Sequence, residues 1–176
     1  MILAGMAASA VSMAEAQAYA RVETGEEEAL LAGLVRSASA LCEAFTGQVL
    51  VMREFVEMIA VSGEWQRLTL NPVRSIDVVE AVAADGSAVV LSADGYAVDI
   101  DARGDGWVRV EGAVEGRIRV SGQAGIASDP NGVPEPLRQG ILRLVAHLFA
   151  TRDGSGGEPP AAVTAMWRPY RRMRLA

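Results

Sequence analysis

Residues 26–47 read EEEALLAGLVRSASALCEAFTG, which is the pattern of a long amphipathic helix. The apolar residues recur every three or four positions and therefore fall on one stripe at 100° per residue; they are Leu30, Leu31, Leu34, Val35, Ala38, Leu41, Cys42 and Phe45. The three glutamates at 26–28 stand in the first turn, where the helix dipole favours carboxylates. Gly47 suits a left-handed C-cap. We predict a helix that ends at about Thr46.

Two further helices are expected on either side of this one. Ser12 and Glu15 have the spacing of a capping box, so a short helix is predicted to run from there to about Val22. Residues 24–27 (TGEE) have the same spacing and are expected to cap the long helix. Residues 134–152 form a second long apolar stripe, with Pro134 or Pro136 in its first turn.

Between the two long helices the sequence changes to a period of two. Residues 107–110 and 117–120 alternate apolar and polar side chains, as half-buried antiparallel strands do. Residues 49–61, 65–70, 75–83, 88–91 and 96–100 are the other predicted strands. Asp85-Gly86 and Asp94-Gly95 are typical turn dipeptides. The sequence therefore predicts an antiparallel β-meander of short strands over residues 48–124.

The predicted fold class is α+β, a small helical bundle with an inserted antiparallel β-meander and an extended C-terminal tail. The bundle has two N-terminal helices and one C-terminal helix. We expect residues 1–11 to be a flexible N-terminal extension and residues 12–152 to be a single α+β domain. Residues 153–176 are expected to be a linker and docking tail, because 153–160 (DGSGGEPP) is a flexible composition. Within the tail we expect one helical turn at 161–167, and Pro169 should keep the chain non-helical.

Composition limits the chemistry that the chain can perform. The 176 residues include one cysteine and one histidine, which excludes an intrachain disulfide and zinc sites built on several such ligands. Cys42 is expected to be a buried core thiol and His147 a surface or subunit-contact residue. Residues 99–105 resemble a calcium loop, but Arg103 and Val110 stand where ligands are required, so turn chemistry is the better interpretation. We therefore predict no enzyme activity, no metal and no cofactor. Separately, no apolar run in the sequence approaches the ~20 residues that a membrane span needs.

Charge is distributed unevenly along the chain. The net charge is −6, and all 16 basic residues are arginines. Residues 165–176 carry four arginines and no acid, so the tail is basic and the remainder is acidic. The tail also contains large apolar and aromatic groups, and Trp, Tyr and Arg are enriched in binding hot spots. We expect it to dock onto its own chain or onto a partner.

Several short motifs, in this order, resemble the head–tail connector (head completion adaptor) family of long-tailed bacteriophages and gene transfer agents. They are SMAEAQAYARV at 12–22 with the acidic turn 23–27, CEAFTG at 42–47, LNPVRSI at 70–76, YAVD at 96–99, VPEPLRQGIL at 133–142, and the tail from 162 to 174. The order and spacing of these pieces carry the resemblance, which covers nearly the whole chain from Ser12.

The resemblance implies a structural role. The chain would form a ring with copies of itself beneath the portal protein and continue the DNA channel to a tail-side stopper or tail protein. DNA would pass without sequence-specific contact, and acidic walls would leave it mobile. The particle would be assembled in the bacterial cytoplasm, with this subunit in its neck. The alternative is a nucleic-acid-binding or regulatory module that uses the arginine-rich tail.

The resemblance also implies that the C-terminal segment engages the portal. The expected portal-binding residues are Trp167, Arg168, Pro169, Tyr170, Arg171, Arg172, Met173 and Arg174. Trp167 and Tyr170 are expected to fill pockets, and the arginines to pair with carboxylates. On this hypothesis, deletion of the chain after Gly154 should leave the melting of the body nearly unchanged and should abolish portal binding.

Overall fold

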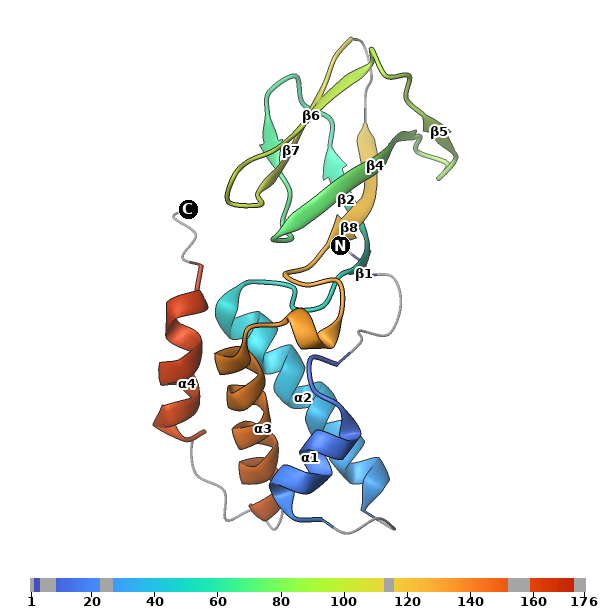
Figure 1. Ribbon diagram of the computed structural model, residues 1–176. Helices are drawn as coiled ribbons and strands as arrows, with labels where there is room; N and C mark the ends of the chain where they lie inside the picture. The colour runs from blue at the N-terminus through green and yellow to red at the C-terminus, as the bar shows by residue number, and fades with distance from the viewer. Residues whose placement is uncertain (1, 4–8, 23–26, 113–115, 152–158, 173–176) are drawn as a thin grey trace. The chain divides into compact units, whose positions relative to one another are not determined.

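The computed structural model describes residues 2–3, 9–22, 27–112, 116–151 and 159–172. The chain divides into two compact units. One, the β unit, comprises Met1–Ala7 and Met52–Ile126; the other, the helical unit, comprises Ala8–Val51 and Ala127–Ala176. The predicted α+β class is confirmed (Figure 1).

The helical unit contains four α-helices and two short 3₁₀ turns among the described residues. The elements are α1 (Met13–Ala20), α2 (Glu28–Thr46), η1 (Pro130–Gly132), α3 (Glu135–Ala150), α4 (Ala161–Trp167) and η2 (Arg168–Tyr170). Helix α3 packs against α1, α2 and α4, and is therefore the centre of the unit. Its buried face consists of Leu137, Gly140, Ile141, Leu142, Leu144 and Val145.

The predicted ends of the helices are largely confirmed. The Ser12 hydroxyl accepts a hydrogen bond from Glu15 N, and the Glu15 carboxylate accepts one from Ser12 N at 2.8 Å. The hydrogen bond from the Ser12 backbone lowers the pKa of Glu15, with a further contribution from Arg138. Arg138 of α3 binds the Glu15 carboxylate and donates to the carbonyl of Ala10 at 3.2 Å. The capping box therefore also joins the N-terminal segment to α3.

Helix α2 ends as expected and begins differently. Gly47 is the C-cap with φ 70°, a left-handed conformation that glycine adopts without a Cβ clash. The predicted capping box at 24–27 lies mostly outside the described residues; Glu27 is the N-cap and makes no side-chain capping bond.

By length and composition, α2 is the helix in the described part of the chain that could cross a membrane. The core helix of a folded unit has the same properties, and Leu31, Val35, Ala38 and Cys42 of α2 are buried.

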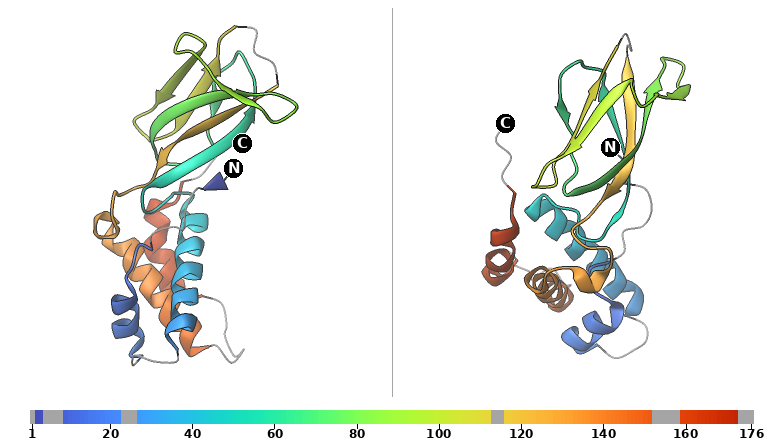
Figure 2. Two further views of the ribbon diagram at one scale, coloured as in Figure 1. Left: turned by 90° about the vertical axis from the view of Figure 1, so that its right-hand side faces the viewer. Right: turned by 45° about the horizontal axis from the view of Figure 1, so that its top comes forward.

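The β unit contains two antiparallel sheets (Figure 2). The strands are β1 (Ile2–Leu3), β2 (Arg53–Ala60), β3 (Gln66–Arg67), β4 (Val73–Val82), β5 (Ala88–Val90), β6 (Tyr96–Ile100), β7 (Gly106–Val110) and β8 (Arg117–Ala124). The larger sheet has the order β1-β2-β8-β4-β5 and the smaller one the order β3-β7-β6. Short antiparallel strands were predicted, but β8 lies between β2 and β4, so the spatial order is not the sequence order.

Alternation along the strands forms the core of the β unit. In β8 every second residue is buried, beginning with Ile118 and Val120, and in β7 Val108 and Val110 are buried. Phe55 of β2 and Val79 of β4 have no exposed surface. The opposite faces carry charge, and there Glu80 of β4 accepts two hydrogen bonds from Arg119 of β8, at 2.6 and 3.0 Å. This bidentate pair supports the register in which the two residues face each other.

Two expectations about the chain ends are corrected by the structure. Residues 1–11 are not wholly a flexible extension, because Ile2–Leu3 pair with β2 and the side chains of Ala10 and Val11 are 1% and 2% exposed. The C-terminal tail is not extended between 161 and 170, where α4 and η2 form. Val163 and Trp167 are four residues apart and share one helix face, so burial of both stabilises the helix. Pro169 ends the α-helix, as expected, but fits the 3₁₀ turn η2.

Candidate functional site

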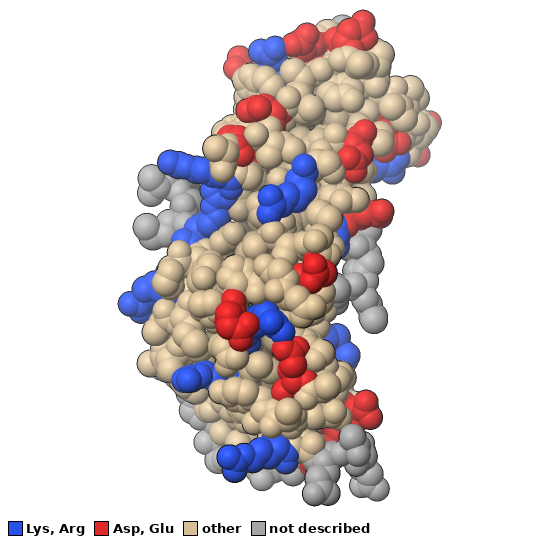
Figure 3. All heavy atoms as spheres, in the orientation of Figure 1, with Lys and Arg blue, Asp and Glu red and all other residues tan. Residues whose placement is uncertain are grey.

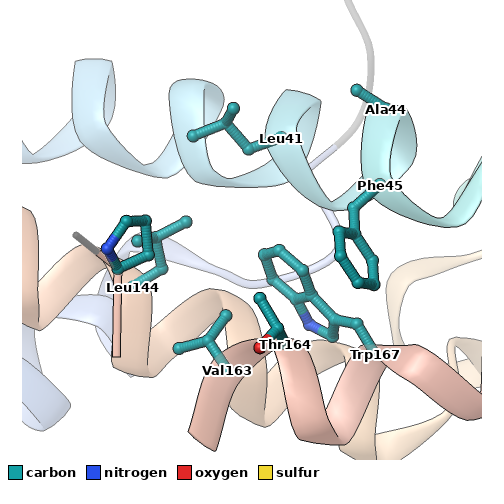
Figure 4. A pocket seen from close by; sticks show the side chains of 8 residues that line it. Leu41, Ala44, Phe45, Leu144, Val163, Thr164 and Trp167 are labelled. Atoms are coloured by element: carbon teal, nitrogen blue, oxygen red, sulfur yellow. The ribbon is translucent and has the colours of Figure 1, made fainter. Parts of the chain in front are cut away.

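The C-terminal segment of residues 159–172 is the candidate site, and it lies against α2 and α3. Helix α4 turns Val163 and Trp167 toward these helices, and both side chains are buried. Figure 4 shows the indole of Trp167 between the side chains of α2 and those of α4, next to Phe45. The two rings are 5.9 Å apart between centroids and are tilted by 53°. This arrangement is common for aromatic pairs in a core.

Trp167 is anchored by a hydrogen bond as well as by packing. Its indole N–H donates to the carbonyl of Leu137 on α3 at 3.2 Å, and the side chain is 3% exposed. A glycine, Gly140, stands where the indole meets α3. Trp167 therefore stabilises the attachment of the C-terminal segment to its own unit, and its ring is not presented to a partner.

A partly open apolar cavity of about 360 Å³ lies beside Trp167. Its lining is almost entirely apolar and comes from α2, α3, α4 and the residue Pro159 before α4 (Figure 4): Leu41, Ala44, Phe45, Leu144, Pro159, Val163, Thr164 and Trp167. The lining offers no titratable group, and its one side-chain hydroxyl, that of Thr164, donates to the carbonyl of Ala161 at 3.0 Å. This cavity is a gap in the packing of α4 on the bundle.

The residues after α4 are held at the C-terminal end of α2. The backbone N–H of Arg172 donates to the carbonyl of Thr46 at 2.9 Å, and Gln48 donates to the carbonyl of Tyr170. The guanidinium of Arg171 lies 5.6 Å from the centroid of the Phe45 ring, within the range of a cation–π contact. The end of a helix attracts cations because its last carbonyls are not paired within the helix. The basic segment and the end of α2 are therefore electrostatically matched.

The structure describes six of the eight predicted portal-binding residues, and these differ in exposure. Arg168, Pro169 and Arg171 are exposed. Tyr170 and Arg172 are half-buried, and Trp167 is buried. Met173 and Arg174 lie outside the described residues. Arg168, Pro169 and Arg171 therefore form a short basic surface, and the buried Trp167 anchors it.

The other residues that the sequence singled out lie apart from this segment or serve the fold. Asp101 accepts backbone hydrogen bonds from Arg103 and Asp105 at 2.8 and 2.9 Å, which confirms turn chemistry in the loop of residues 99–105. His147 is half-buried near the end of α3 and accepts, through its carbonyl, a bond from Thr151. In the described part of the chain, no three His, Cys, Asp or Glu side chains gather as metal ligands would.

Cys42 is a core thiol, as predicted. It has no exposed surface in α2, and burial raises the pKa of its thiol to about 12, with Glu43 contributing. Since the thiolate is the reactive form, we expect a thiol reagent at pH 8 to label the folded protein more slowly than the unfolded protein, by a factor on the order of 100 or more. The measurement is the rate of colour release from a disulfide reagent with and without guanidinium. Equal rates would show that Cys42 is accessible in the folded state.

The sequence did not reveal the role of Trp167 as an internal anchor. The apolar pair Val163 and Trp167 has helical spacing, and this is the signal that could have indicated a packed helix. The flexible composition of 153–160 and the presence of Pro169 argued instead for an extended tail. Gly140 did not indicate this contact in the sequence, because an isolated glycine in a helix does not identify the group that approaches it.

The chain was compared with known proteins in sequence and in structure. No protein-family model matches the sequence, and no curated protein matches it. Among solved structures, a chain from the neck of an empty gene transfer agent particle, computed with C6 symmetry, has a TM-score of 0.79 and 26% identity. The alignment covers 100% of this chain and 98% of that one.

Two further solved structures give the same result for the fold. A chain in the virion of a native gene transfer agent particle has a TM-score of 0.79 at 24% identity, with 99% of this chain and 96% of that chain covered. A chain in the neck of a native particle, computed with C12 symmetry, has a TM-score of 0.78 at 24% identity, covering 100% and 98% of the two chains. The resemblance seen in the sequence is confirmed: this chain is similar in fold, over its whole length, to chains from the neck of gene transfer agent particles.

Proposed function

We propose that this protein is a structural connector subunit in the neck of a phage-like or gene transfer agent particle. It would form a ring under the portal and continue the DNA channel toward a tail-side stopper or tail protein. The observation that carries the proposal is the match over 100% of the chain to a neck structure. Fold alone does not define function, but coverage of both units by one neck protein supports a shared structural role.

The charge of the chain is compatible with a DNA channel. The acid excess lies mainly in the β unit, where the sequence has 12 Asp and Glu against 7 Arg. On the face shown in Figure 3, acidic side chains gather over the loops at one end of that unit. Carboxylates repel phosphates and would leave a passing duplex mobile. No described feature favours the alternative of a nucleic-acid-binding module.

The portal-docking surface is proposed to be the exposed part of the C-terminal segment, namely Arg168, Pro169 and Arg171, continued by Met173 and Arg174. Trp167, with Tyr170 and Arg172, would hold this surface against α2 and α3. This changes the role expected for Trp167 from a group that fills a portal pocket to the support of the residues that make contact. A subunit that is held in the neck by such contacts would need no catalytic site for this role.

The test is electron microscopy of the purified protein mixed with the portal protein from the same particle. A ring of this chain attached to the portal is the expected result. Association with DNA that weakens steeply with salt, in the absence of portal binding, would favour the nucleic-acid-binding alternative and overturn the proposal.

Charge reversal tests the docking surface itself. We expect the double variant Arg168→Glu, Arg171→Glu to lower portal affinity about tenfold or more at low salt, because charges at an interface steer association and pair with partner carboxylates. The effect should shrink as salt screens the charges. The matched control is Arg143→Glu, a reversal at an exposed arginine of α3. Titration calorimetry gives the affinities and circular dichroism checks the fold; equal affinities of both variants would exclude this surface.

A further inference from the structure

Two tryptophans, Trp65 and Trp107, alternate with two arginines, Arg67 and Arg109, on the outer face of the smaller sheet of the β unit. Arg67 of β3 faces Trp107 of β7 in register, and Gln66 faces Val108. One step further along this register, Trp65 faces Arg109. The guanidinium of Arg109 lies 5.1 Å from the Trp65 ring centroid, and that of Arg67 lies 6.0 Å from the Trp107 ring. Each cation therefore stacks on an aromatic ring of the neighbouring strand.

This arginine–tryptophan surface has the properties of a preformed contact site. Trp65 is 42% exposed, although tryptophan is a costly residue to leave in water. Stacking restricts the arginine side chains before any partner arrives, so less conformational entropy is lost on binding. Trp and Arg are also the residue types that dominate binding energy at interfaces. The core of the unit does not need this face, since Val108 and Val110 of β7 point the other way and are buried.

The same unit exposes a second, unlike surface at strand β5. This strand is the last in its sheet, and its Val89 and Val90 are 68% and 64% exposed. Bonds from Ala83 N to Ser87 O and from Leu91 N to Val79 O set the alternation of the β4–β5 ladder. That alternation directs the backbone groups of Ala88 and Val90 to the outer edge. Such an edge pairs readily with another chain.

The β5 edge is bordered by carboxylates that remain ionised. Asp85 stands in the turn before β5 and Asp94 in the turn after it, and both are exposed. A side-chain hydrogen bond from Ser87 lowers the pKa of Asp85, and one from Ser92 lowers that of Asp94. The β5 edge thus combines exposed aliphatic groups with negative charge. The arginine–tryptophan surface combines aromatic groups with two guanidinium groups, of which that of Arg109 also pairs with Glu111 at 2.5 Å.

We propose that the arginine–tryptophan surface of one copy of this chain binds the β5 edge of the next copy. A ring requires head-to-tail contacts between two different surfaces, and these two are complementary in charge and both partly apolar. In Figure 1, β5 lies apart from β7, the strand that carries Trp107 and Arg109, so one β unit can present both surfaces at once. This inference rests on the proposed connector function and names the surfaces through which its ring would close. The net negative charge of the β unit disfavours a nucleic acid as the occupant.

The experiment uses two full-length variants, each of which breaks one surface. The first is Arg67→Glu, Arg109→Glu on the arginine–tryptophan surface, and the second is Val90→Lys on the β5 edge. Both replace exposed or half-exposed side chains, so the fold should survive, and circular dichroism verifies it. Arg36→Glu, a reversal at an exposed residue of α2, is the control. Sedimentation velocity measures association up to about 1 mM, the effective concentration range that neighbours on a shared template experience.

The expected result is that wild type and the Arg36→Glu control associate, whereas each surface variant alone is at least tenfold weaker. An equimolar mixture of the two variants should give one-to-one dimers and nothing larger, because only one intact pair of surfaces remains. Absence of dimers in the mixture, or unchanged association of either variant, would overturn the proposal. A wild-type protein that stays monomeric at about 1 mM would also overturn the proposal. Failure of the connector function would be seen separately, as association of the wild type without binding to the portal.

Discussion

Replacement of Trp167 by alanine is expected to lower the free energy of unfolding of the helical unit by about 3–5 kcal/mol. The indole is 3% exposed, contacts Phe45 and donates a hydrogen bond to Leu137. Its removal would enlarge an existing cavity of about 360 Å³, and nearby side chains cannot collapse fully into the space. Urea unfolding followed by helical circular dichroism measures the loss.

The β unit supplies a matched control for this substitution. Trp65→Ala removes the same side chain at a position that is 42% exposed, and should cost less than about 1 kcal/mol. Should Trp167→Ala prove too unstable to purify, Trp167→Phe keeps an aromatic ring, loses the hydrogen bond, and is expected to cost about 1–2 kcal/mol. Equal stability of Trp167→Ala and wild type would mean that α4 is not docked in solution.

The same contacts reverse the expected result of truncation. From the sequence, deletion after Gly154 was expected to leave melting of the body nearly unchanged. In the structure that deletion removes Val163 and Trp167 and uncovers the α2–α3 face that they bury. The truncated protein should therefore melt at a lower temperature than wild type. Loss of portal binding by this variant alone would not identify the docking surface, which is why the exposed arginines are the better test.

Local signals explain which parts of the fold could be predicted. The Ser12–Glu15 capping box, the end of α2 at Gly47 and the apolar stripes of α2 and α3 depend on residues close in sequence. The placement of β8 between β2 and β4 depends on pairing between distant residues, and alternation in β8 is the same whichever strands are its neighbours. The basic C-terminal segment was recognised from its composition. Its division into a buried anchor and an exposed surface required the packing of α4 against α3.

Gly140→Ala gives the most specific test of that packing. In a helix interior, alanine is ordinarily better than glycine by about 1 kcal/mol. A Cβ at position 140 of α3 would lie 2.0 Å from the indole nitrogen of Trp167 and 2.8 Å from two of its carbons. Trp167 is enclosed by Phe45 and Val163, so it cannot yield without loss of contacts. We therefore expect Gly140→Ala to destabilise the helical unit by about 1–3 kcal/mol, against its helix propensity.

A second glycine and a double variant separate this clash from other effects. A Cβ at Gly33, inside α2, would find its nearest neighbour 3.8 Å away, at the end of the flexible Arg36 side chain. Gly33→Ala should accordingly stabilise the unit by about 0.5–1 kcal/mol.

When Trp167 is already alanine, the obstacle at position 140 is gone, so the added Gly140→Ala should change from destabilising to neutral or stabilising. The two substitutions would then show a coupling of about 2 kcal/mol or more in urea unfolding. Additive effects would mean that α4 does not pack against Gly140 in solution, and the C-terminal arginines would then be presented from a free tail, as the sequence alone suggested.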